Sequence, residues 1–490
     1  MPSERKTPKI LSIWKEEVDL TSGNLFKKML LFTLPVILSS LLQLVYSSAD
    51  LLVVDYFGGG AFSMAAVGDN GSLISLIVNT FIGISVGANV VVASAKGAKD
   101  KEKASKALHS SIIISLVLGV FVACFGYRLA PVFLVAMHTP TEIVGLASVY
   151  LRIYFLGVPF ILVFNFGSAI LRAMGDSRRP LYALIACGIL NVCLNLLFVI
   201  VFKKDVWGVA VATVISEGLE AFLTILFLIH HKKGFVSMTK KDLHYDDVVG
   251  GEVLRHGIPA GLESLIFSIS NVVIQAQANT FNAFAVSGNT ASDNIEGYIF
   301  VVLEAFAVAV SSIVSQNYGA NNKQNLRKSL LYSFLTITVL GISLGGLAAL
   351  LRYQLIGIFI HGTGEGMEEA TRVGTQRLIL MGLTYWICAM MDIFSAYLRG
   401  IKHPIAPTIV TIVCACAMRF IWVYGFFDRI PGMHTLLWLY AVYPITWTIA
   451  DLTYLTIIPR FTKKAYAEID ARLSLASRDT QNSNLQPSSK

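Results

Sequence analysis

The chain has 490 residues, of which 55% are hydrophobic and only 14% are charged, and its mean hydropathy is +0.65. A soluble domain of this length does not need so many apolar residues for its core, so the composition excludes an ordinary water-soluble protein. The net charge of +8 does not indicate a nucleic-acid-binding protein, because lysine and arginine lie in short segments between long apolar runs.

About 24 polar residues precede the first apolar run, which leads into a polytopic pattern without a credible cleavage site. We therefore expect residues 1–24 to form a cytoplasmic tail and not a secretory signal peptide. Twelve apolar runs follow, and each should cross a bilayer core about 30 Å thick as a helix, because lipid offers no partner for an open backbone. The predicted spans are 28–56, 62–95, 107–129, 145–172, 180–202, 207–230, 253–281, 293–318, 329–351, 373–399, 404–427 and 434–458.

The second half of the chain repeats the pattern of the first. Pro35 and Pro259 open corresponding spans, and Pro180 and Pro404 are separated by the same interval in the sequence. Because each copy holds an even number of spans, both copies keep the same orientation, which makes a parallel repeat about an axis along the membrane normal. We therefore predict an all-α polytopic membrane protein, with twelve transmembrane helices in two six-helix bundles.

The repeat divides the chain into two lobes and three polar segments. After the tail over 1–24, we predict an N-lobe over 25–230, a cytoplasmic linker over 231–252 and a C-lobe over 253–460. A cytoplasmic tail over 461–490 is rich in serine, asparagine, glutamine and charge, and this composition predicts disorder.

The basic residues predict the orientation. With an internal N-terminus, 30 of the 39 lysines and arginines fall on the cytoplasmic side, Arg172 and Arg399 among them, and six fall on the other side. Cytoplasmic loops carry such an excess, so both termini are predicted to be cytoplasmic, in a multi-pass protein of the plasma (inner) membrane. Only Arg152, Arg377 and Arg419 are assigned to the interior of spans.

Acidic residues inside spans are the first candidates for function, since an ionised side chain at membrane depth is costly and usually marks an ion or substrate path. Asp50 is the clear case in the first half. In the second half the candidates are Glu263, Glu304 and Asp392, with Arg419 as a counter-charge. An internal pairing of Glu263 or Glu304 with a polar neighbour is an equally good interpretation.

Two asparagines and a threonine extend the first candidate site. Asn191 and Asn195 are four residues apart, so their amides share one helix face, and Thr213 on the next helix offers a hydroxyl oxygen. A carboxylate with neutral oxygens suits a small hard cation or a proton. Hydrogen bonding between helices is the alternative role of these amides.

Short motifs in a fixed order identify the family that the chain resembles. They are Pro35, ADLLVVDYFGG from Ala49, AAVG at 65–68, LRAMGDSRRPLY from Leu171, SQNYGAN from Ser315, and LRG before the basic-proline turn at 398–404. The chain resembles the multidrug and toxic compound extrusion (MATE) transporters over nearly everything from Leu25 to about Arg460.

This resemblance implies a V-shaped pair of six-helix bundles that exchanges sodium ions or protons for organic, often cationic, substrates. It assigns Asp50, Asn191 and Thr213 to the cation site of the N-lobe. Asn195 departs from relatives that carry aspartate there, which favours a sodium site of Asp50, Asn191, Asn195 and Thr213 over a network of two carboxylates.

The substrate is expected in the cleft between the lobes. Aromatic rings and acids suit amphipathic cations there. The expected cleft residues are Tyr46, Phe164, Asn165, Glu263, Tyr298, Glu304 and Asp392.

The nearest alternative is a flippase for a lipid-linked saccharide or another lipid-like substrate of the same superfamily. Such a protein would line its cleft with several basic residues, and the assignment of only three arginines to spans favours drug export. An enzyme is not expected, because no catalytic or nucleotide-binding motif occurs. We expect a monomer with no cofactor other than the coupling ion, and with a small organic molecule and the lipid bilayer as its partners, without nucleic acid.

Overall fold

The computed structural model describes residues 17–58, 61–137, 139, 141–230, 234–239, 243–360 and 364–485, and all regular structure in these residues is helical. Twelve helices within them are long and apolar enough to cross a membrane, which confirms the predicted number of spans. The first half contains α2 (Leu25–Phe57), α3 (Ala61–Gly97), α4 (Lys101–Ala136), α5 (Val144–Ala173), α6 (Arg178–Leu196) with the π-helix η1 (Leu197–Val201), and α7 (Asp205–Ile229).

The second half repeats this plan with more irregular helices. It contains α8 (Asp247–Ala278), α9 (Ala283–Gly319), α10 (Lys323–Leu350), α11 (Arg352–Ile356), α12 (Glu365–Gly400), α13 (Ile405–Val410), η2 (Thr411–Ala417), α14 (Met418–Ile421), η3 (Trp422–Phe427), η4 (Pro431–Met433) and α15 (Leu436–Leu485). The elements from α13 to η3 form one span, Ile405–Phe427, in which π-helical turns interrupt the α-helix.

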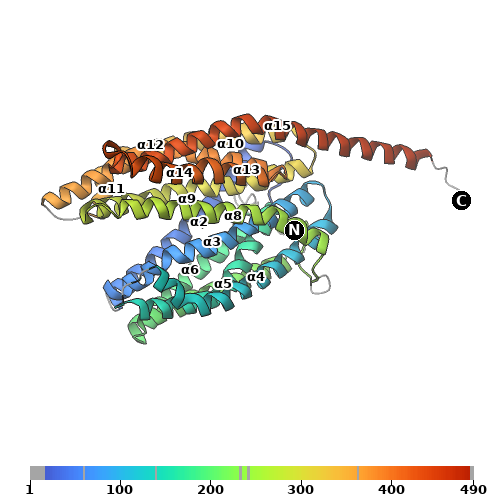
Figure 1. The fold of residues 1–490 in the computed structure, drawn as a ribbon. Coiled ribbons are helices and arrows are strands. Elements are labelled where there is room, and N and C mark those ends of the chain that lie inside the picture. The colour runs from blue at the N-terminus through green and yellow to red at the C-terminus, as the bar shows by residue number, and fades with distance from the viewer. Residues whose placement is uncertain are drawn as a thin grey trace, which may run out of the picture.

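The helices form two groups that meet at one end. Figure 1 shows α3–α7 in one group and α8–α15 in the other, converging at the end where the termini lie and diverging at the opposite end. This arrangement confirms the predicted V of two helical bundles. We call the end that carries the termini the terminal end.

The lobes touch closely at the terminal end. A Cβ added to Gly97 of α3 would lie 1.9 Å from the carbonyl oxygen of Gln316 on α9, so only glycine permits this approach. Asn89 Nδ2 donates to Ser312 Oγ across the same interface at 2.8 Å, and Gln316 Nε2 donates to the carbonyl oxygen of Ala173 at 2.7 Å. The V is therefore closed at the terminal end.

Helix α2 belongs to both lobes. Its first turns bury Met29 and Phe32 in the same core as the C-lobe helices α9 and α12, whereas Val53 and Val54 near its other end pack in an N-lobe core. Pro35 lies within this helix. The predicted N-lobe boundary at residue 25 therefore does not describe the packing, because hydropathy does not reveal which bundle a span joins.

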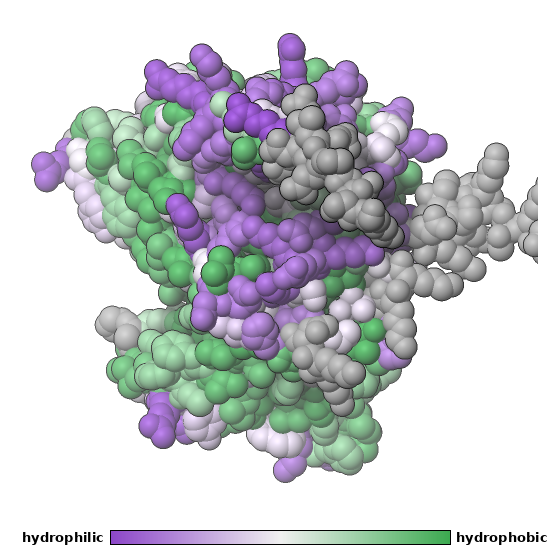
Figure 2. Space-filling view, turned by 90° about the vertical axis from the view of Figure 1, so that its right-hand side faces the viewer, coloured by the Kyte–Doolittle hydropathy of each residue, from purple (hydrophilic) through white to green (hydrophobic). Residues whose placement is uncertain are grey.

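The side surface of the molecule is apolar. Large hydrophobic side chains such as Val117 and Phe121 of α4 are more than half exposed at 62% and 51%, as expected for a surface in contact with lipid. Figure 2 looks onto the terminal end, where hydrophilic residues gather in a band between apolar flanks. This distribution supports a multi-pass membrane protein.

Two predicted polar segments are helical in part. Helix α8 begins at Asp247, and Asp246 caps it by accepting a hydrogen bond from Val249 N at 2.9 Å, so residues 247–252 are not linker. Disorder was wrongly predicted over 461–485, where α15 continues. Ala465 and Ile469 are buried, and Tyr318 Oη donates to Glu468, so docking on the bundle offsets the polar composition. Residues 486–490 of that tail lie outside the described residues.

Candidate functional site

A cavity of about 330 Å³ lies within the N-lobe, lined by α2, α3, α5, α6 and α7. Asp50 faces it from the last third of α2, Asn191 from α6 and Thr213 from α7. Asn195 comes one turn after Asn191 on α6 and is fully buried. The structure thus brings the four residues of the predicted cation site together.

Hydrogen bonds join these four side chains. Asn195 Nδ2 donates to Asp50 Oδ1 at 2.6 Å and to Asn191 Oδ1 at 3.1 Å. Thr213 Oγ1 lies 3.3 Å from Asp50 Oδ2 and also donates to the carbonyl oxygen of Val209 at 3.0 Å. Three helices therefore converge on one carboxylate.

The donor set suits a small hard cation. It offers the two carboxylate oxygens of Asp50 with the neutral oxygens of Asn191, Asn195 and Thr213, which are the oxygen ligands that hard cations prefer. Asn195 Oδ1 is buried and has no hydrogen-bond partner in the described part of the chain. A polar atom left unpaired in this way is costly, and rotation of the amide would turn this oxygen toward Asp50, where it would become a cation ligand.

Two further acids line the same cavity and were missed from the sequence. Glu217 and Glu220 lie on α7, one and two turns beyond Thr213. Oε2 of Glu217 and Oε1 of Glu220 are buried without a partner among the described residues. The rule that selected Asp50, an ionisable residue within a span, would have found both in Asp205–Ile229.

Three of the predicted cleft residues lie beside the cation site. Tyr46, Phe164 and Asn165 line the N-lobe cavity and do not line the larger cavity between the lobes. Asn79 and Ile82 of α3 line both cavities, so the two adjoin.

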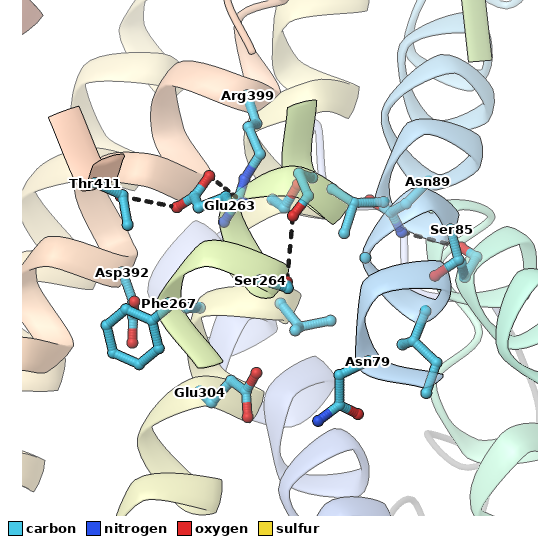
Figure 3. A pocket seen from close by; sticks show the side chains of 18 of the residues that line it. Asn79, Ser85, Asn89, Glu263, Ser264, Phe267, Glu304, Asp392, Arg399 and Thr411 are labelled. Carbon is cyan, nitrogen blue, oxygen red and sulfur yellow. Dashed lines mark hydrogen bonds and ion pairs between the residues drawn. The ribbon is translucent and has the colours of Figure 1, made fainter. Parts of the chain in front are cut away.

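The cavity between the lobes has a volume of about 440 Å³. Glu263, Glu304 and Asp392 line it from α8, α9 and α12, as expected for cleft residues. Figure 3 shows these carboxylates on the C-lobe helices, with the amides of Asn79 and Asn89 on α3 across the space from them. Carboxylates from three helices therefore converge on one cavity.

The three acids have different surroundings. Glu263 accepts hydrogen bonds from Ser395 at 3.0 Å and Thr411 at 3.1 Å, and its Oε2 lies 3.3 Å from Arg399 Nη1. Glu304 and Asp392 have neither a hydrogen-bond nor an ion-pair partner within the described residues. Internal pairing is therefore the structural role of Glu263, and the other two carboxylates remain free for a cationic ligand.

Tyr298, the remaining residue predicted for the cleft, does not line it in the structure. Tyr298 of α9 is 40% exposed and is not among the residues that line the cavities described here. An apolar run with an aromatic residue does not specify which side of its helix faces the cleft, so the sequence placed Tyr298 by composition alone.

Two arginines assigned to cytoplasmic segments line the cleft. Arg172 lies in the last turn of α5 and Arg399 in the last turn of α12, and both face the cavity between the lobes. The assignment to loops was wrong because the helices extend to Ala173 and Gly400. The cleft thus contains basic as well as acidic groups.

A second polar cluster, also missed from the sequence, lies inside the C-lobe. Arg377 of α12 forms an ion pair with the buried Glu296 at 2.9 Å and a second one with Asp293, and it donates to Asn289. Arg377, Asp293 and Asn289 line a third cavity of about 440 Å³ together with Tyr385 and other aromatic side chains. The acids Asp293 and Glu296 were overlooked within the span that contains Glu304.

Arg419 does not act as the counter-charge of a carboxylate. It donates to Ser270 Oγ at 2.9 Å and Asn271 Oδ1 at 2.7 Å, and its guanidinium lies over the rings of Phe267 and Tyr443 at 4.8 and 4.7 Å. Neutral oxygens and π-faces hold this cation in place.

Comparison with known proteins agrees with this architecture. The sequence profile of the MatE family matches residues 35–197 and again 259–424, one match in each lobe. The chain belongs to the MatE family. It is therefore a membrane transporter and not an enzyme, and the two matches begin at Pro35 and Pro259, as the internal repeat predicts.

The sequence is similar to several bacterial proteins that are named as multidrug resistance proteins. It is 28% identical to the probable multidrug resistance protein YpnP of Bacillus subtilis over 63% of this chain and 68% of that protein. It is 25% identical to the probable multidrug resistance protein YoeA of the same organism, over 79% and 84% of the two chains.

Solved structures show the same fold. A crystal structure of MATE in complex with MaL6 superposes with a TM-score of 0.84 at 24% identity, covering 92% of this chain and 100% of that one. The outward-facing conformation of a multidrug resistance MATE family transporter of the MOP superfamily gives a TM-score of 0.80 at 25% identity, covering 92% and 99%.

Proposed function

We propose that this MATE transporter exports small organic molecules in exchange for a cation that binds at Asp50. The observation that carries the proposal is the N-lobe cavity, in which Asp50, Glu217 and Glu220 face one space and form no ion pair within the described residues. Three uncompensated carboxylates inside a membrane protein favour a mobile counter-ion. The relatives named as multidrug resistance proteins support an organic substrate.

Sodium is the coupling ion that the donor set favours over a proton. Asn195 supplies a neutral amide where a second carboxylate would suit proton transfer, and its unpaired Oδ1 is available as a ligand. A hard cation with oxygen ligands needs the amide of Asn195 to rotate, so that Oδ1 and not Nδ2 faces Asp50.

The coupling mechanism follows from the position of α2. Asp50 connects α2 to α6 and α7 through Asn195 and Thr213, while the first turns of α2 are part of the C-lobe core. Binding of a cation at Asp50 therefore changes the packing of a helix that both lobes share. Transport follows if the cation binds the two states of alternating access unequally.

The substrate occupies the cavity between the lobes in this proposal. A volume of about 440 Å³ suits a drug-sized molecule, and Glu304 and Asp392 attract a cationic group. Because the cavity adjoins the cation site at Asn79 and Ile82, substrate and cation are close enough to influence each other.

The orientation remains the one that the basic residues predict, with the terminal end facing the cytoplasm of a bacterial-type plasma membrane. Closure of the V at that end then corresponds to an outward-open state. A monomer is the transporting unit in this proposal.

The test is uptake of a fluorescent organic cation into inverted membrane vesicles, driven by a sodium gradient or, in separate runs, by a proton gradient. Wild type should accumulate the dye with sodium, and Asp50→Asn should lose gradient-driven uptake. Asp428→Asn, which changes a carboxylate that lies near Gln277 outside both cavities, is the matched control and should transport normally. Inserted wild-type protein that responds to neither gradient would refute coupled export.

A further inference from the structure

Two arginines at corresponding positions of the internal repeat lie beside the cavity between the lobes. Arg172 ends α5 of the N-lobe and Arg399 ends α12 of the C-lobe, and the two stand in matching sequence contexts. Both line the same cavity. Because the two arginines occupy corresponding positions, their surroundings can be compared directly.

In the C-lobe, the arginine is neutralised within the protein. Arg399 Nη1 lies 3.3 Å from Glu263 Oε2, and Glu263 is held by Ser395 and Thr411. Figure 3 shows Arg399, Glu263 and Thr411 connected in this way at one side of the cavity. The negative charge of Glu263 thus weakens the attraction of Arg399 for an anionic ligand.

In the N-lobe, the corresponding arginine has no carboxylate. When Pro35 is aligned with Pro259, the counterpart of Glu263 is Ser39, whose hydroxyl donates to the carbonyl oxygen of Pro35 at 2.8 Å. The side chain of Arg172 forms no hydrogen bond or ion pair with any described residue, and its Nε, like that of Arg399, is buried without a partner. The dipole at the end of α5 favours a basic residue there but supplies no counter-ion.

A half-buried arginine whose Nε is buried and unpaired is unfavourable, and an incoming anion would relieve this cost. A guanidinium binds a carboxylate through two parallel hydrogen bonds. Across the same cavity, Glu304 and Asp392 form no ion pair or hydrogen bond through their carboxylates in the described part of the chain. The cavity therefore presents positive charge on its N-lobe side and negative charge on its C-lobe side.

We propose that the cavity between the lobes binds zwitterionic organic molecules, with Arg172 binding the carboxylate and Glu304 and Asp392 facing the cationic group. This inference rests on the proposed export function and names its substrate class. The anion is an oxyanion tethered to a cation, which a soluble zwitterion and a zwitterionic lipid headgroup both provide. A soluble zwitterion is the better match, since a cavity of about 440 Å³ accommodates a drug-sized molecule.

The experiment compares two dyes that differ in one charge: a rhodamine with a free carboxylate, and the methyl ester of the same dye. Fluorescence polarisation measures their binding to the full-length protein in detergent micelles. Wild type should bind the carboxylate dye about tenfold more tightly than the ester, the size expected for a hydrogen-bonded charge. Arg172→Met should abolish this preference and leave ester binding intact, and Arg172→Lys should retain part of it.

Arg152→Met is the matched control. Arg152 is on the same helix, but it lies over the ring of Tyr127 at 5.6 Å and does not line the cavity. Its removal should leave the preference unchanged. Equal binding of the two dyes by wild type, or a preference that survives in Arg172→Met, would overturn the proposal.

Two further arms separate the alternatives. Sodium-driven uptake of the ester dye into vesicles tests export alone, so uptake without a carboxylate preference refutes only the zwitterion site. A preference for the carboxylate without uptake of either dye supports the site and refutes coupled export. The last arm measures displacement of the bound carboxylate dye by a water-soluble short-chain phosphatidylcholine. If the lipid displaces the dye at a lower concentration than excess carboxylate dye does, and only when Arg172 is present, the site belongs to lipid headgroups. This result would overturn the soluble substrate.

Discussion

The two lobes share a fold but treat the same position in opposite ways. When the halves are aligned on Pro35 and Pro259, Asn195 corresponds to Arg419 and Asp50 to Ile274. The N-lobe therefore has a carboxylate surrounded by neutral oxygens, whereas the C-lobe has a guanidinium held by neutral groups. In the C-lobe the positive charge belongs to the side chain of Arg419, whereas the N-lobe has no basic side chain at this position and its carboxylate is open to a mobile cation.

The acids around these positions show the same contrast. Glu217 and Glu220 have no basic partner among the described residues, while Glu296 of the C-lobe is paired with Arg377. The buried acid of the Arg377 cluster in the C-lobe is thus paired, whereas the acids around Asp50 in the N-lobe are not. The comparison teaches that charge balance, more than fold, distinguishes a coupling site from a structural cluster.

The largest effect is expected from breaking the balanced cluster. Arg377→Met should lower the free energy of unfolding by about 3–5 kcal/mol, because it leaves the buried Glu296 without its counter-charge. Thermal unfolding in detergent measures this loss. The double variant Arg377→Met/Glu296→Met should recover most of it, and a double variant as unstable as the single one would contradict a charge-balance role.

Replacing Asp50 and Asn195 with the residues at the corresponding C-lobe positions should abolish the stabilisation of the protein by sodium. In wild type, saturating sodium should stabilise the protein by about 2–3 kcal/mol relative to choline. The variant Asp50→Ile/Asn195→Arg copies the C-lobe pair and should show no such stabilisation while remaining folded. Arg419→Lys, which keeps a cation at the C-lobe position, is the control and should retain the full sodium response. A response that persists in the exchanged variant would place the sodium site elsewhere.

A smaller effect is expected for the acids without direct contact to Asp50. Glu217→Gln and Glu220→Gln each remove one negative charge from the N-lobe cavity and should weaken sodium binding by about 1 kcal/mol, or roughly fivefold. The measurement is the sodium concentration for half-maximal uptake. Glu252→Gln changes an acid that Lys103 and Lys402 already neutralise outside the cavity, and its sodium dependence should match wild type.

The smallest effect should come from a single neutral ligand. Thr213→Val keeps the size of the side chain but removes a hydroxyl 3.3 Å from Asp50, which should cost about 0.5–1.5 kcal/mol of sodium affinity. Thr213→Ser should bind sodium like wild type in the same uptake titration. If the valine and serine variants behave alike, Thr213 is a packing residue only.

The sequence by itself determined the number of spans, the two-lobe repeat and the candidate set of Asp50, Asn191, Asn195 and Thr213. Hydropathy and the spacing of Asn191 and Asn195 are local properties, and each helix expresses them regardless of its neighbours. Pro35 and Pro259 similarly located the two copies that the family profile matches.

Only the tertiary structure decided which charges are paired and what faces the cleft. It placed Arg172 and Arg399 in one cavity, gave Glu263 to only one of them, and joined the start of α2 to the opposite lobe. It also docked the part of α15 around Glu468 on α9, although the polar composition of this segment predicts disorder. These outcomes depend on contacts between helices far apart in the sequence, and the free energy of a buried charge is set by those contacts and not by its neighbours in the chain.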